Sequence, residues 1–494
     1  MSRAGFPFLF GIYGKKATRD TVKVLKDTGA CGVLLLARNI ETAEQTRALT
    51  SELVQRVGRP LVFAVDHEGG WVLRFKAGVT PLPGNCALGR CGDEKLAYAT
   101  GRQMALELRP LGIQLNLAPV LDVLTQAYNP GIGIRSFGSD PVLVGRLGAA
   151  MIRGMQDHGV AACAKHFPGK GAASVDAHVA LPTIKLPRRV FERDHLRPFG
   201  DAVKAGVACV MTSHVRYPEL DSAIATFSTK IIGGLLRRRL GFNGVVVADD
   251  LCMGAVTGRM PVQQAAVSSL AAGHDLLIIA HDLQAQAESA ELIEQAVTEK
   301  IIDRASLARS CRRIEALFDP PRPKSGLACA EEGARLARAV ARLGVRPARS
   351  GSLALPLRRS RKPLLVIFPD FREVSERFTF EGGPLGPERQ LKRRLKAWGP
   401  AKIVRCPIEN DKINGLAESA AAAERVLFFC FEARRFPGQR AALQALSRGM
   451  AKKTVLCMIR GGWDLALADA AMTALDVGGY RLTQVEAALD ALLA

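Results

Sequence analysis

The stretch AACAKHFPGKGAASVDAHVALP, residues 161–182, joins a strand of buried type to a polar, glycine-rich loop. It begins with small apolar residues, and the basic pair Lys165 and His166 follows them. A Pro/Gly loop then leads to Asp176 and His178, two positions apart. Functional side chains are commonly carried on loops that a rigid strand edge positions. The stretch therefore predicts an active-site loop, and it indicates what the rest of the chain must provide.

Short apolar runs alternate with longer amphipathic stretches through about the first 280 residues. Such strand–helix alternation indicates a parallel sheet covered by helices. There are eight runs, at residues 8–13, 31–37, 61–66, 113–120, 161–166, 208–214, 245–249 and 276–280. Eight units of this kind predict an α/β fold of the (β/α)8 TIM-like barrel type.

Charged or imidazole side chains follow most of these runs directly. They are Arg38, Asp66, His67, Glu68, Asp122, Lys165, His166, His214, Asp249 and Asp250, with Asn39 beside Arg38. In a parallel barrel the carboxyl ends of all strands open on one mouth, where active sites are built. Helix capping would explain one or two of these residues, but not the whole ring.

The alternating pattern breaks at residues 319–327, DPPRPKSGL, whose proline and glycine content is typical of a linker. A second alternating region begins at Pro363 and indicates a smaller α/β sandwich with a mainly parallel sheet. The sequence thus predicts three parts: a catalytic barrel domain at 1–318, a linker at 319–362 and a C-terminal α/β sandwich domain at 363–494.

The composition is that of an ordinary globular protein, with 48% hydrophobic and 23% charged residues among 494. No apolar run approaches the roughly 18 residues that a membrane helix needs, so we expect no membrane partner. The N-terminus lacks the apolar segment and cleavage site of a signal peptide. The 11 cysteines are odd in number and often lie inside apolar runs, which is typical of reduced thiols. We therefore expect a cytoplasmic protein.

The formal net charge is +21, from 68 basic and 47 acidic residues. Such an excess is compatible with an anionic partner, or with a solvated basic surface that has none. The basic residues are scattered, with short clusters at 358–362 and 392–396, and no aromatic residues are interleaved with them. We therefore favour the solvated surface and expect no nucleic-acid partner.

Two groups of residues are candidates for catalysis. Asp249 ends the apolar run GVVVADDL, where a carboxylate can act as nucleophile or general base. A helix cap or a salt bridge would explain one aspartate equally well, and Asp250 beside it leaves the choice open. Asp176 and His178 can place a carboxylate beside an imidazole, which suits a general acid/base near neutral pH. Two unrelated polar residues of a surface loop would have the same spacing.

Further residues are candidates for ligand binding. Lys165 and His166 leave a strand end together, and a buried lysine requires a partner or ligand because an unpaired buried charge is costly. Arg74 and Arg135 add hydrogen-bond donors, and Asp66 adds an acceptor. Charged donors and acceptors around one mouth suit a polyhydroxylated ligand. The phosphate-binding patterns GxxxxGK[ST] and GxGxxG are absent.

A metal site is the alternative for some of the same side chains. The possible ligands are His67, Glu68, His166, Asp176, His178 and His214. However, HExxH is absent, and Glu68 directly follows His67, so the i, i+4 spacing of helical zinc ligands is missing. We therefore expect no metal and no organic cofactor.

Five motifs in this order resemble the family 3 glycoside hydrolases, and among them the bacterial β-N-acetylglucosaminidases of the NagZ type. They are DHEGGWVLRF (66–75), NLAPVLDV (116–123), NPGIGIRSFGSDP (129–141), KHFPGKGAASVDAHVALP (165–182) and GVVVADDLCMGAV (244–256). The stretch GVLLLARNIETAEQTRALTSEL near the start matches that group too. The resemblance is strong over residues 8–290 and looser over the C-terminal region, where it points to two-domain members.

The resemblance implies a retaining mechanism through a covalent glycosyl-enzyme. It implies that Asp249, rather than Asp250, is the nucleophile and that His178, supported by Asp176, is the general acid/base. A neutral imidazole avoids a second anion beside the nucleophile, so both groups can work near pH 7. The residues that the resemblance assigns to the N-acetylglucosamine ring are Asp66, Arg74, Arg135, Lys165 and His166.

The substrate that the resemblance implies is a muropeptide derived from peptidoglycan, or a chitooligosaccharide, with a terminal β-linked N-acetylglucosamine. One residue departs from the family pattern KHFPGHG, because position 170 is lysine. Since the D-x-H spacing is unchanged, we expect catalysis to be retained. The alternatives are a family 3 exo-glycosidase of other specificity, such as a β-glucosidase, and a catalytically silent carbohydrate-binding protein. Neither the oligomeric state nor the natural aglycone is predicted.

Overall fold

A computed structural model describes residues 6–177, 179–318, 326, 328–378, 380–381 and 383–493. The contacts between residues divide the chain into two compact units. Unit 1 comprises Met1–Glu68, Gly78–Thr80 and Gly92–Ala330, and unit 2 comprises Gly69–Ala77, Pro81–Cys91 and Glu331–Ala494.

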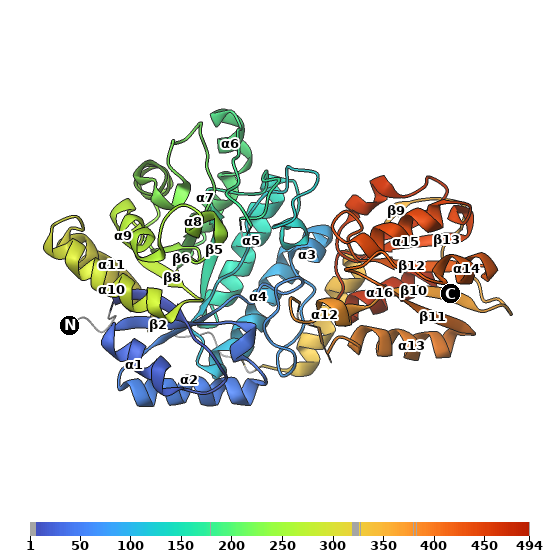
Figure 1. Cartoon of the computed structure of the whole chain (residues 1–494), viewed down its shortest axis with the longest axis horizontal. Coiled ribbons are helices and arrows are strands. Elements are labelled where there is room, and N and C mark those ends of the chain that lie inside the picture. The colour runs from blue at the N-terminus through green and yellow to red at the C-terminus, as the bar shows by residue number, and fades with distance from the viewer. Residues whose placement is uncertain are drawn as a thin grey trace. The chain divides into compact units, whose positions relative to one another are not determined.

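The described part of unit 1 is built on a closed barrel of eight parallel strands in sequence order (Figure 1). The strands are β1 (Phe6–Gly11), β2 (Ala30–Leu35), β3 (Val62–Val65), β4 (Leu115–Asn116), β5 (Ala161–Phe167), β6 (Cys209–Thr212), β7 (Val245–Ala248) and β8 (Leu276–Ile279). Parallel pairing of β1 with β8, with Phe10 opposite Ile279, closes the barrel. Each of the eight apolar runs overlaps one strand, and the predicted (β/α)8 barrel is confirmed.

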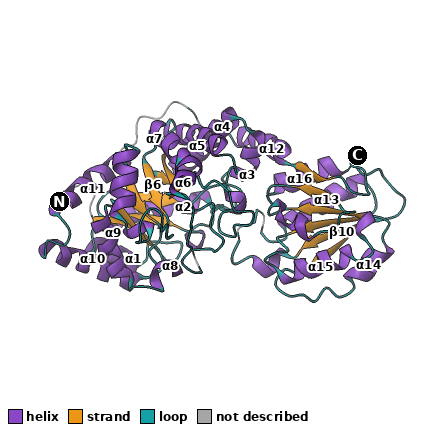
Figure 2. Cartoon of the chain, turned by 90° about the horizontal axis from the view of Figure 1, so that it is seen from above, coloured by secondary structure: helices purple, strands orange, loops and turns teal. Residues whose placement is uncertain are grey.

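Helices follow the strands along the chain and surround the barrel (Figure 2). They are α1 (Arg19–Asp27), α2 (Ala43–Val57), α4 (Glu94–Leu108), α5 (Pro141–Gln156), α6 (Arg188–Asp194), α7 (Arg197–Lys204), α8 (Gly254–Thr257), α9 (Val262–Ala272), α10 (Leu283–Thr298) and α11 (Arg304–Phe318). Several begin at capping side chains: Thr42 accepts a hydrogen bond from Gln45 N, and Asp140 accepts one from Val142 N. None of the described helices is long and apolar enough to cross a membrane.

The barrel core explains why the strands are apolar on both faces. One cluster of buried side chains includes residues from all eight strands, such as Leu9, Cys163 and Ile278, and extends to Ile314 and Leu317 on α11. The outer face of each strand is covered by helices, as expected for a parallel sheet. All 11 cysteines are free thiols, and six of them are buried.

Asp275, just before β8, joins several elements of unit 1. Its carboxylate accepts hydrogen bonds from Ser310 Oγ (2.7 Å), Arg313 Nη1 (2.8 Å) and Val246 N (2.9 Å), and from Arg237. Asp275 is 1% exposed. These contacts connect α11 and the π-helical segment around Arg237 to the amino ends of two strands.

Unit 2 is a three-layer α/β sandwich, as predicted. Its six-stranded sheet has the order β11-β10-β12-β13-β14-β9, with β9 antiparallel to β14. The strands are β9 (Arg346–Arg349), β10 (Leu364–Pro369), β11 (Ala401–Cys406), β12 (Val426–Cys430), β13 (Thr454–Met458) and β14 (Thr473–Asp476). The helices are α3 (Asn85–Cys91), α12 (Ala330–Gly344), α13 (Gly386–Trp398), α14 (Leu416–Ala422), α15 (Pro437–Ser447) and α16 (Leu482–Leu492).

The two faces of this sheet have separate cores. Along β10, Val366 belongs to the cluster that contains residues of α13 and α16, whereas its neighbours Leu365 and Ile367 belong to the cluster that contains residues of α14 and α15. This alternation follows from the opposite directions of successive side chains in a strand. Helices therefore cover both faces.

The chain divides between the units differently from the three contiguous parts expected from the sequence. Helix α12 and strand β9 lie within the stretch 319–362 predicted to be a linker, of which residues 319–325 and 327 lie outside the described residues. The strand β9, RPAR, is polar and lies at the sheet edge, so it has no apolar pattern to reveal it. Two segments of the predicted barrel domain, Gly69–Ala77 and Pro81–Cys91, belong to unit 2.

We predict that Asp275→Ala destabilises unit 1 by about 3 kcal/mol, because the substitution leaves Arg237 and Arg313 without their shared carboxylate. Urea unfolding measures the effect. The matched control is Asp27→Ala, which removes an exposed pair with Lys23 and should leave stability almost unchanged. Equal losses in the two variants would contradict the proposed role of Asp275.

Candidate active site

The carboxyl ends of β3 and β5 carry a buried network of opposite charges. Lys165 Nζ lies 2.6 Å from Asp66 Oδ1 and 2.7 Å from Glu68 Oε1. Arg135 binds the same glutamate with two hydrogen bonds, Nε to Oε2 at 2.9 Å and Nη2 to Oε1 at 2.8 Å. Lys165 and Glu68 are each 2% exposed. The buried lysine therefore has the partners that its position required.

The charges in this network stabilise one another's ionised forms. Burial acts to raise the pKa of Glu68, but Arg135 and Lys165 outweigh it and hold that pKa at about 2. Burial likewise acts to lower the pKa of Lys165, and the carboxylates of Asp66 and Glu68 outweigh it and raise it. Glu68 and Lys165 are therefore both ionised at neutral pH.

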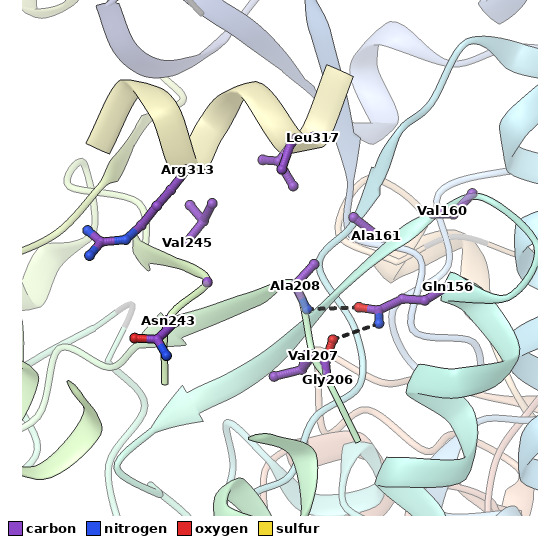
Figure 3. Close-up of a pocket in the computed structure, with 12 residues that line it drawn as sticks. Gln156, Val160, Ala161, Gly206, Val207, Ala208, Asn243, Val245, Arg313 and Leu317 are labelled. Carbon is purple, nitrogen blue, oxygen red and sulfur yellow. Dashed lines mark hydrogen bonds between the residues drawn. The ribbon is translucent and has the colours of Figure 1, made fainter. Parts of the chain in front are cut away.

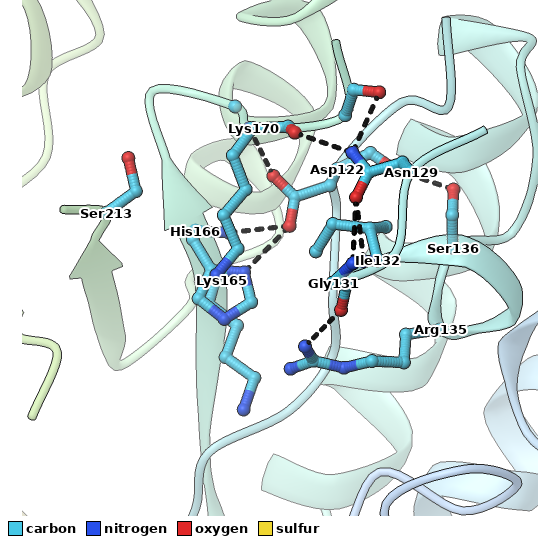
Figure 4. Close-up of polar contacts among 12 residues, drawn as sticks. Asp122, Asn129, Gly131, Ile132, Arg135, Ser136, Lys165, His166, Lys170 and Ser213 are labelled. Carbon is cyan, nitrogen blue, oxygen red and sulfur yellow. Dashed lines mark hydrogen bonds and ion pairs between the residues drawn. The ribbon is translucent and has the colours of Figure 1, made fainter. Parts of the chain in front are cut away.

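Asp122 orients the ring of His166 (Figure 4). Asp122 Oδ2 lies 2.7 Å from His166 Nδ1, and the same carboxylate accepts hydrogen bonds from the backbone N–H of His166 (3.3 Å) and of Lys170 (2.6 Å). Asp122 is fully buried, and burial raises its pKa to about 6 against the opposing effect of Lys170. Its three contacts hold the imidazole and the start of the following loop in one geometry.

Asn129 connects the loop after β5 to the motif that carries Arg135. Its side-chain amide donates to Lys170 O (3.0 Å) and Gly171 O (3.2 Å), and its side-chain oxygen accepts from Ile132 N (2.9 Å) (Figure 4). Gly171 also approaches the backbone closely, since a Cβ there would lie 1.8 Å from Val123 O. Only glycine fits such an approach.

Lys170, the residue that departs from the family pattern, is buried with 6% exposure. Burial lowers its pKa, while the nearby carboxylates of Asp249, Asp122 and Asp176 act to raise it and Arg135 acts to lower it. The substitution therefore brings an additional basic group among the acidic groups of the barrel mouth.

The catalytic pair predicted in the loop is only partly described. Asp176 is in place, and its backbone carbonyl accepts hydrogen bonds from Val179 N (3.0 Å) and Ala180 N (3.1 Å), which makes a turn. Its carboxylate lies beside Gly131, since a Cβ on that glycine would be 3.4 Å from Asp176 Cγ. His178 lies outside the described residues. The Asp176–His178 pair stays a prediction.

The two aspartates after β7 differ in their surroundings. Asp250 accepts hydrogen bonds from Cys252 N (3.1 Å) and Ala280 N (3.0 Å), and burial raises its pKa. The carboxylate of Asp249 accepts a hydrogen bond from Asp250 N at 3.0 Å. Asp250 thus stabilises the turn after the strand and connects it to β8, a structural role that Asp249 does not share.

His214, at the end of β6, completes the ring of polar residues. Its Nδ1 lies 2.6 Å from Thr226 Oγ1 and its Nε2 lies 3.0 Å from the backbone oxygen of Asp250. Burial lowers the pKa of His214, so its imidazole is neutral at neutral pH. A neutral imidazole between these groups holds the turn that carries Asp249.

A family comparison identifies the fold and its site. Residues 7–317 match the model of the glycosyl hydrolase family 3 N-terminal domain. This chain belongs to glycosyl hydrolase family 3. The resemblance read from the five motifs is confirmed, and the chain is assigned to the glycoside hydrolases.

Relatives of this family 3 chain have related names. The chain is 36% identical over 340 residues to a protein of Thiobacillus denitrificans named beta-hexosaminidase, covering 68% of this chain and 92% of that protein. It is 39% identical over 264 residues to a beta-hexosaminidase of Hydrogenovibrio crunogenus, covering 52% of this chain and 74% of that protein. A solved family 3 beta-N-acetylglucosaminidase from Paenibacillus sp. is 31% identical with a TM-score of 0.91, covering 99% of this chain and 95% of that one.

The structure brings most of the predicted site residues of this family 3 hydrolase into unit 1. Asp66, Lys165 and Arg135 meet in one network, while Arg74 lies on a segment that belongs to unit 2. Two central residues were not predicted as site residues. Glu68 and Asp122 were placed at the barrel mouth, but no pairing was predicted for them, because their partners are 67 or more and 44 or more residues away along the chain. Among the described residues, no group of three or more His, Cys, Asp or Glu side chains could hold a metal ion.

A cavity of about 360 Å³ lies at the amino ends of three barrel strands, away from the carboxyl ends that carry the charged network (Figure 3). Its lining includes Ala161, Ala208 and Val245 at the amino ends of β5 to β7 and Leu317 on α11. The side chain of Gln156 accepts a hydrogen bond there from Ala208 N (2.8 Å) and donates one to Gly206 O (2.9 Å). This lining has no acid/base pair, so the carboxyl ends form the candidate active site.

We predict that Glu68 makes the stability of unit 1 sensitive to acid. Because its pKa is about 2 in the fold and ordinarily 4.5, the ionised form contributes about 3 kcal/mol. This contribution is present above about pH 4.5 and is lost as the pH falls toward 2. Urea unfolding at several pH values should show a shallower acid loss in Glu68→Gln than in the unsubstituted protein. Identical slopes below pH 4.5 would contradict the assignment.

Proposed function

We propose that the protein is a retaining exo-β-N-acetylglucosaminidase that removes terminal β-linked N-acetylglucosamine. The observation that carries the proposal is the arrangement at the barrel mouth, where Asp249 follows one strand and a preorganised set of charged donors and acceptors follows others. The names of the relatives support a hexosaminidase activity. A polyhydroxylated ring needs several such donors and acceptors at once.

Asp249 is the proposed nucleophile. The carboxylate of its neighbour Asp250 is engaged by two backbone N–H groups and lies 3.6 Å from His281 Nε2, so it would have to break these contacts to react. Asp249 can attack the anomeric carbon and form a covalent glycosyl-enzyme, which water then hydrolyses. Two inversions at the same carbon retain the configuration.

His178 is the proposed general acid/base, with Asp176 as its supporting carboxylate. The proposal rests on the D-x-H spacing and the family resemblance, together with the position of Asp176 beside Gly131. His178 protonates the leaving oxygen in the first step and takes a proton from water in the second. An imidazole can do both near neutral pH because its ordinary pKa is about 6.5.

Five residues are proposed to hold the N-acetylglucosamine ring: Asp66, Arg74, Arg135, Lys165 and His166. Asp66 is part exposed while its partner Lys165 is buried, so a sugar hydroxyl is proposed to reach the exposed part of the Asp66 side chain. The contact with Asp122 keeps the His166 ring in one orientation before substrate arrives. Such preorganisation reduces the entropy lost on binding.

The proposed substrates are muropeptide fragments or chitooligosaccharides, met in the cytoplasm, with no metal, no organic cofactor and no nucleic acid involved. Muropeptides carry carboxylates, and the net charge of +21 favours the approach of anionic molecules. Lys170 adds a basic group near Asp249 and is proposed to leave catalysis intact.

A substrate panel tests the sugar preference. We predict that nitrophenyl β-N-acetylglucosaminide is cleaved with a kcat/KM at least about a hundredfold above that for nitrophenyl β-glucoside, because a site that hydrogen-bonds an acetamido group rejects a sugar without it. A faster reaction with the glucoside would favour a β-glucosidase. No turnover of either would favour a carbohydrate-binding protein without catalysis.

Trapping and substitution test the nucleophile. Asp249→Asn is predicted to lower kcat on the order of 10⁴-fold, because the covalent intermediate can no longer form. Incubation with a 5-fluoro N-acetylglucosaminyl donor, followed by peptide mapping, should label Asp249. The matched variant Asp250→Asn should lower thermal stability and still be labelled at Asp249. Label on Asp250 would overturn the assignment.

A further inference from the structure

The sheet of unit 2 has a strand order that commonly creates a ligand site. Its parallel strands β10 to β14, taken in chain order as one to five, are arranged 2-1-3-4-5. The direction of winding reverses between β10 and β12. In open α/β sheets, ligands bind outside the carboxyl ends of the strands at such a reversal.

The side chain of Trp71 occupies the carboxyl edge of this sheet. Its ring centroid lies 4.4 Å from that of Phe378, 6.1 Å from Phe431 and 5.5 Å from Tyr480. The guanidinium carbon of Arg460 lies 3.4 Å from the Trp71 ring centroid. Phe378 follows β10, Phe431 follows β12, Arg460 follows β13 and Tyr480 follows β14. Four neighbouring strands therefore each contribute one contact.

The backbone of the same segment is also bound. Arg481 is fully buried, and its Nε donates a hydrogen bond to Gly70 O at 2.5 Å. Gly70 N donates to Leu82 O at 2.7 Å, and Gly70 has a φ of +55°, with Pro83 O 2.6 Å from the position of an added Cβ. The segment is therefore held through main chain and side chain together.

Both arginines have buried carboxylate partners. Arg460 pairs with Glu432, which has a left-handed backbone with φ of +58°, and Arg481 Nη1 lies 3.4 Å from Glu381 Oε2. Such a backbone is unfavourable for glutamate and persists where the surroundings require it. Buried ion pairs contribute little stability compared with well-packed apolar residues. Packing alone therefore does not explain why two buried ion pairs contact one segment. A need to fix the geometry of that segment does explain it.

We propose that this crevice is a ligand site occupied by the chain itself: it binds Gly69–Ala77, and Arg460 and Arg481 act as positioning residues for Arg74. The segment begins directly after Glu68, which pairs with Lys165 and Arg135, and it carries Arg74 three residues beyond Trp71. Unit 2 thereby holds the segment that carries Arg74 and supplies no group that reacts. The inference rests on the proposed role of Arg74 in substrate binding.

The experiment replaces Arg460, whose guanidinium lies over the Trp71 ring. Arg460→Met is made alone and with Glu432→Gln, so that the second protein has no unpaired buried carboxylate. Amide hydrogen exchange of residues 69–77 and the kcat and KM for nitrophenyl β-N-acetylglucosaminide are measured in the full chain. We expect exchange of the segment and KM each to rise about tenfold in the double variant, with kcat within about threefold, because a displaced binding residue weakens ground-state and transition-state binding alike.

Two further variants separate positioning from packing. Trp71→Phe keeps an aromatic face for Arg460 but reduces the contact with the surrounding side chains, so its KM should rise less than that of the double variant. Trp398→Phe alters the same core cluster on α13 and should lower thermal stability without changing KM. A tenfold rise of exchange with unchanged KM, or no rise of exchange at all, would overturn the proposal. If the unsubstituted protein does not cleave the substrate, the proposed function fails, whereas the exchange measurement still decides whether the crevice holds the segment.

Discussion

The buried carboxylate of Glu68 is the point on which the barrel mouth depends. It follows β3, it binds Lys165 from β5, and it takes two hydrogen bonds from Arg135 on the loop beyond β4. It compensates the burial of both cations, because an isolated charge in the interior is far more costly than a paired one, and Lys165 has Asp66 as a second partner. Its backbone also continues directly into Gly69–Ala77, which belongs to unit 2.

Neighbouring acidic residues take different roles because their surroundings differ. Asp122 and Asp250 are surrounded by backbone N–H groups, and burial raises the pKa of each. Asp122 holds the ring of His166, and Asp250 holds the turn after β7. Asp66 is partly exposed and shares Lys165 with Glu68. Residue type alone does not distinguish a structural carboxylate from a functional one; its hydrogen-bond partners and exposure do.

Much of the fold was predictable from local pattern. The eight strands of the barrel were found because both of their faces are buried, so that the apolar residues are continuous in sequence. Polar residues at or just after their carboxyl ends, such as Lys165 and Asp249, then pointed to the mouth. The edge strand β9 was missed because RPAR has no apolar pattern. The structural roles of Glu68 and Asp122 were missed because their partners are distant in sequence.

The sequence by itself determined the barrel, the sandwich and the family, because periodic burial and ordered motifs are properties of the linear chain. Only the tertiary structure decided which charges pair, that Asp250 is bound by two backbone N–H groups and connected to β8, and that Trp71 packs on the core of unit 2. Those outcomes depend on distances between residues far apart along the chain. Arg460 meets Trp71 across almost 400 positions, and no local pattern encodes such a contact.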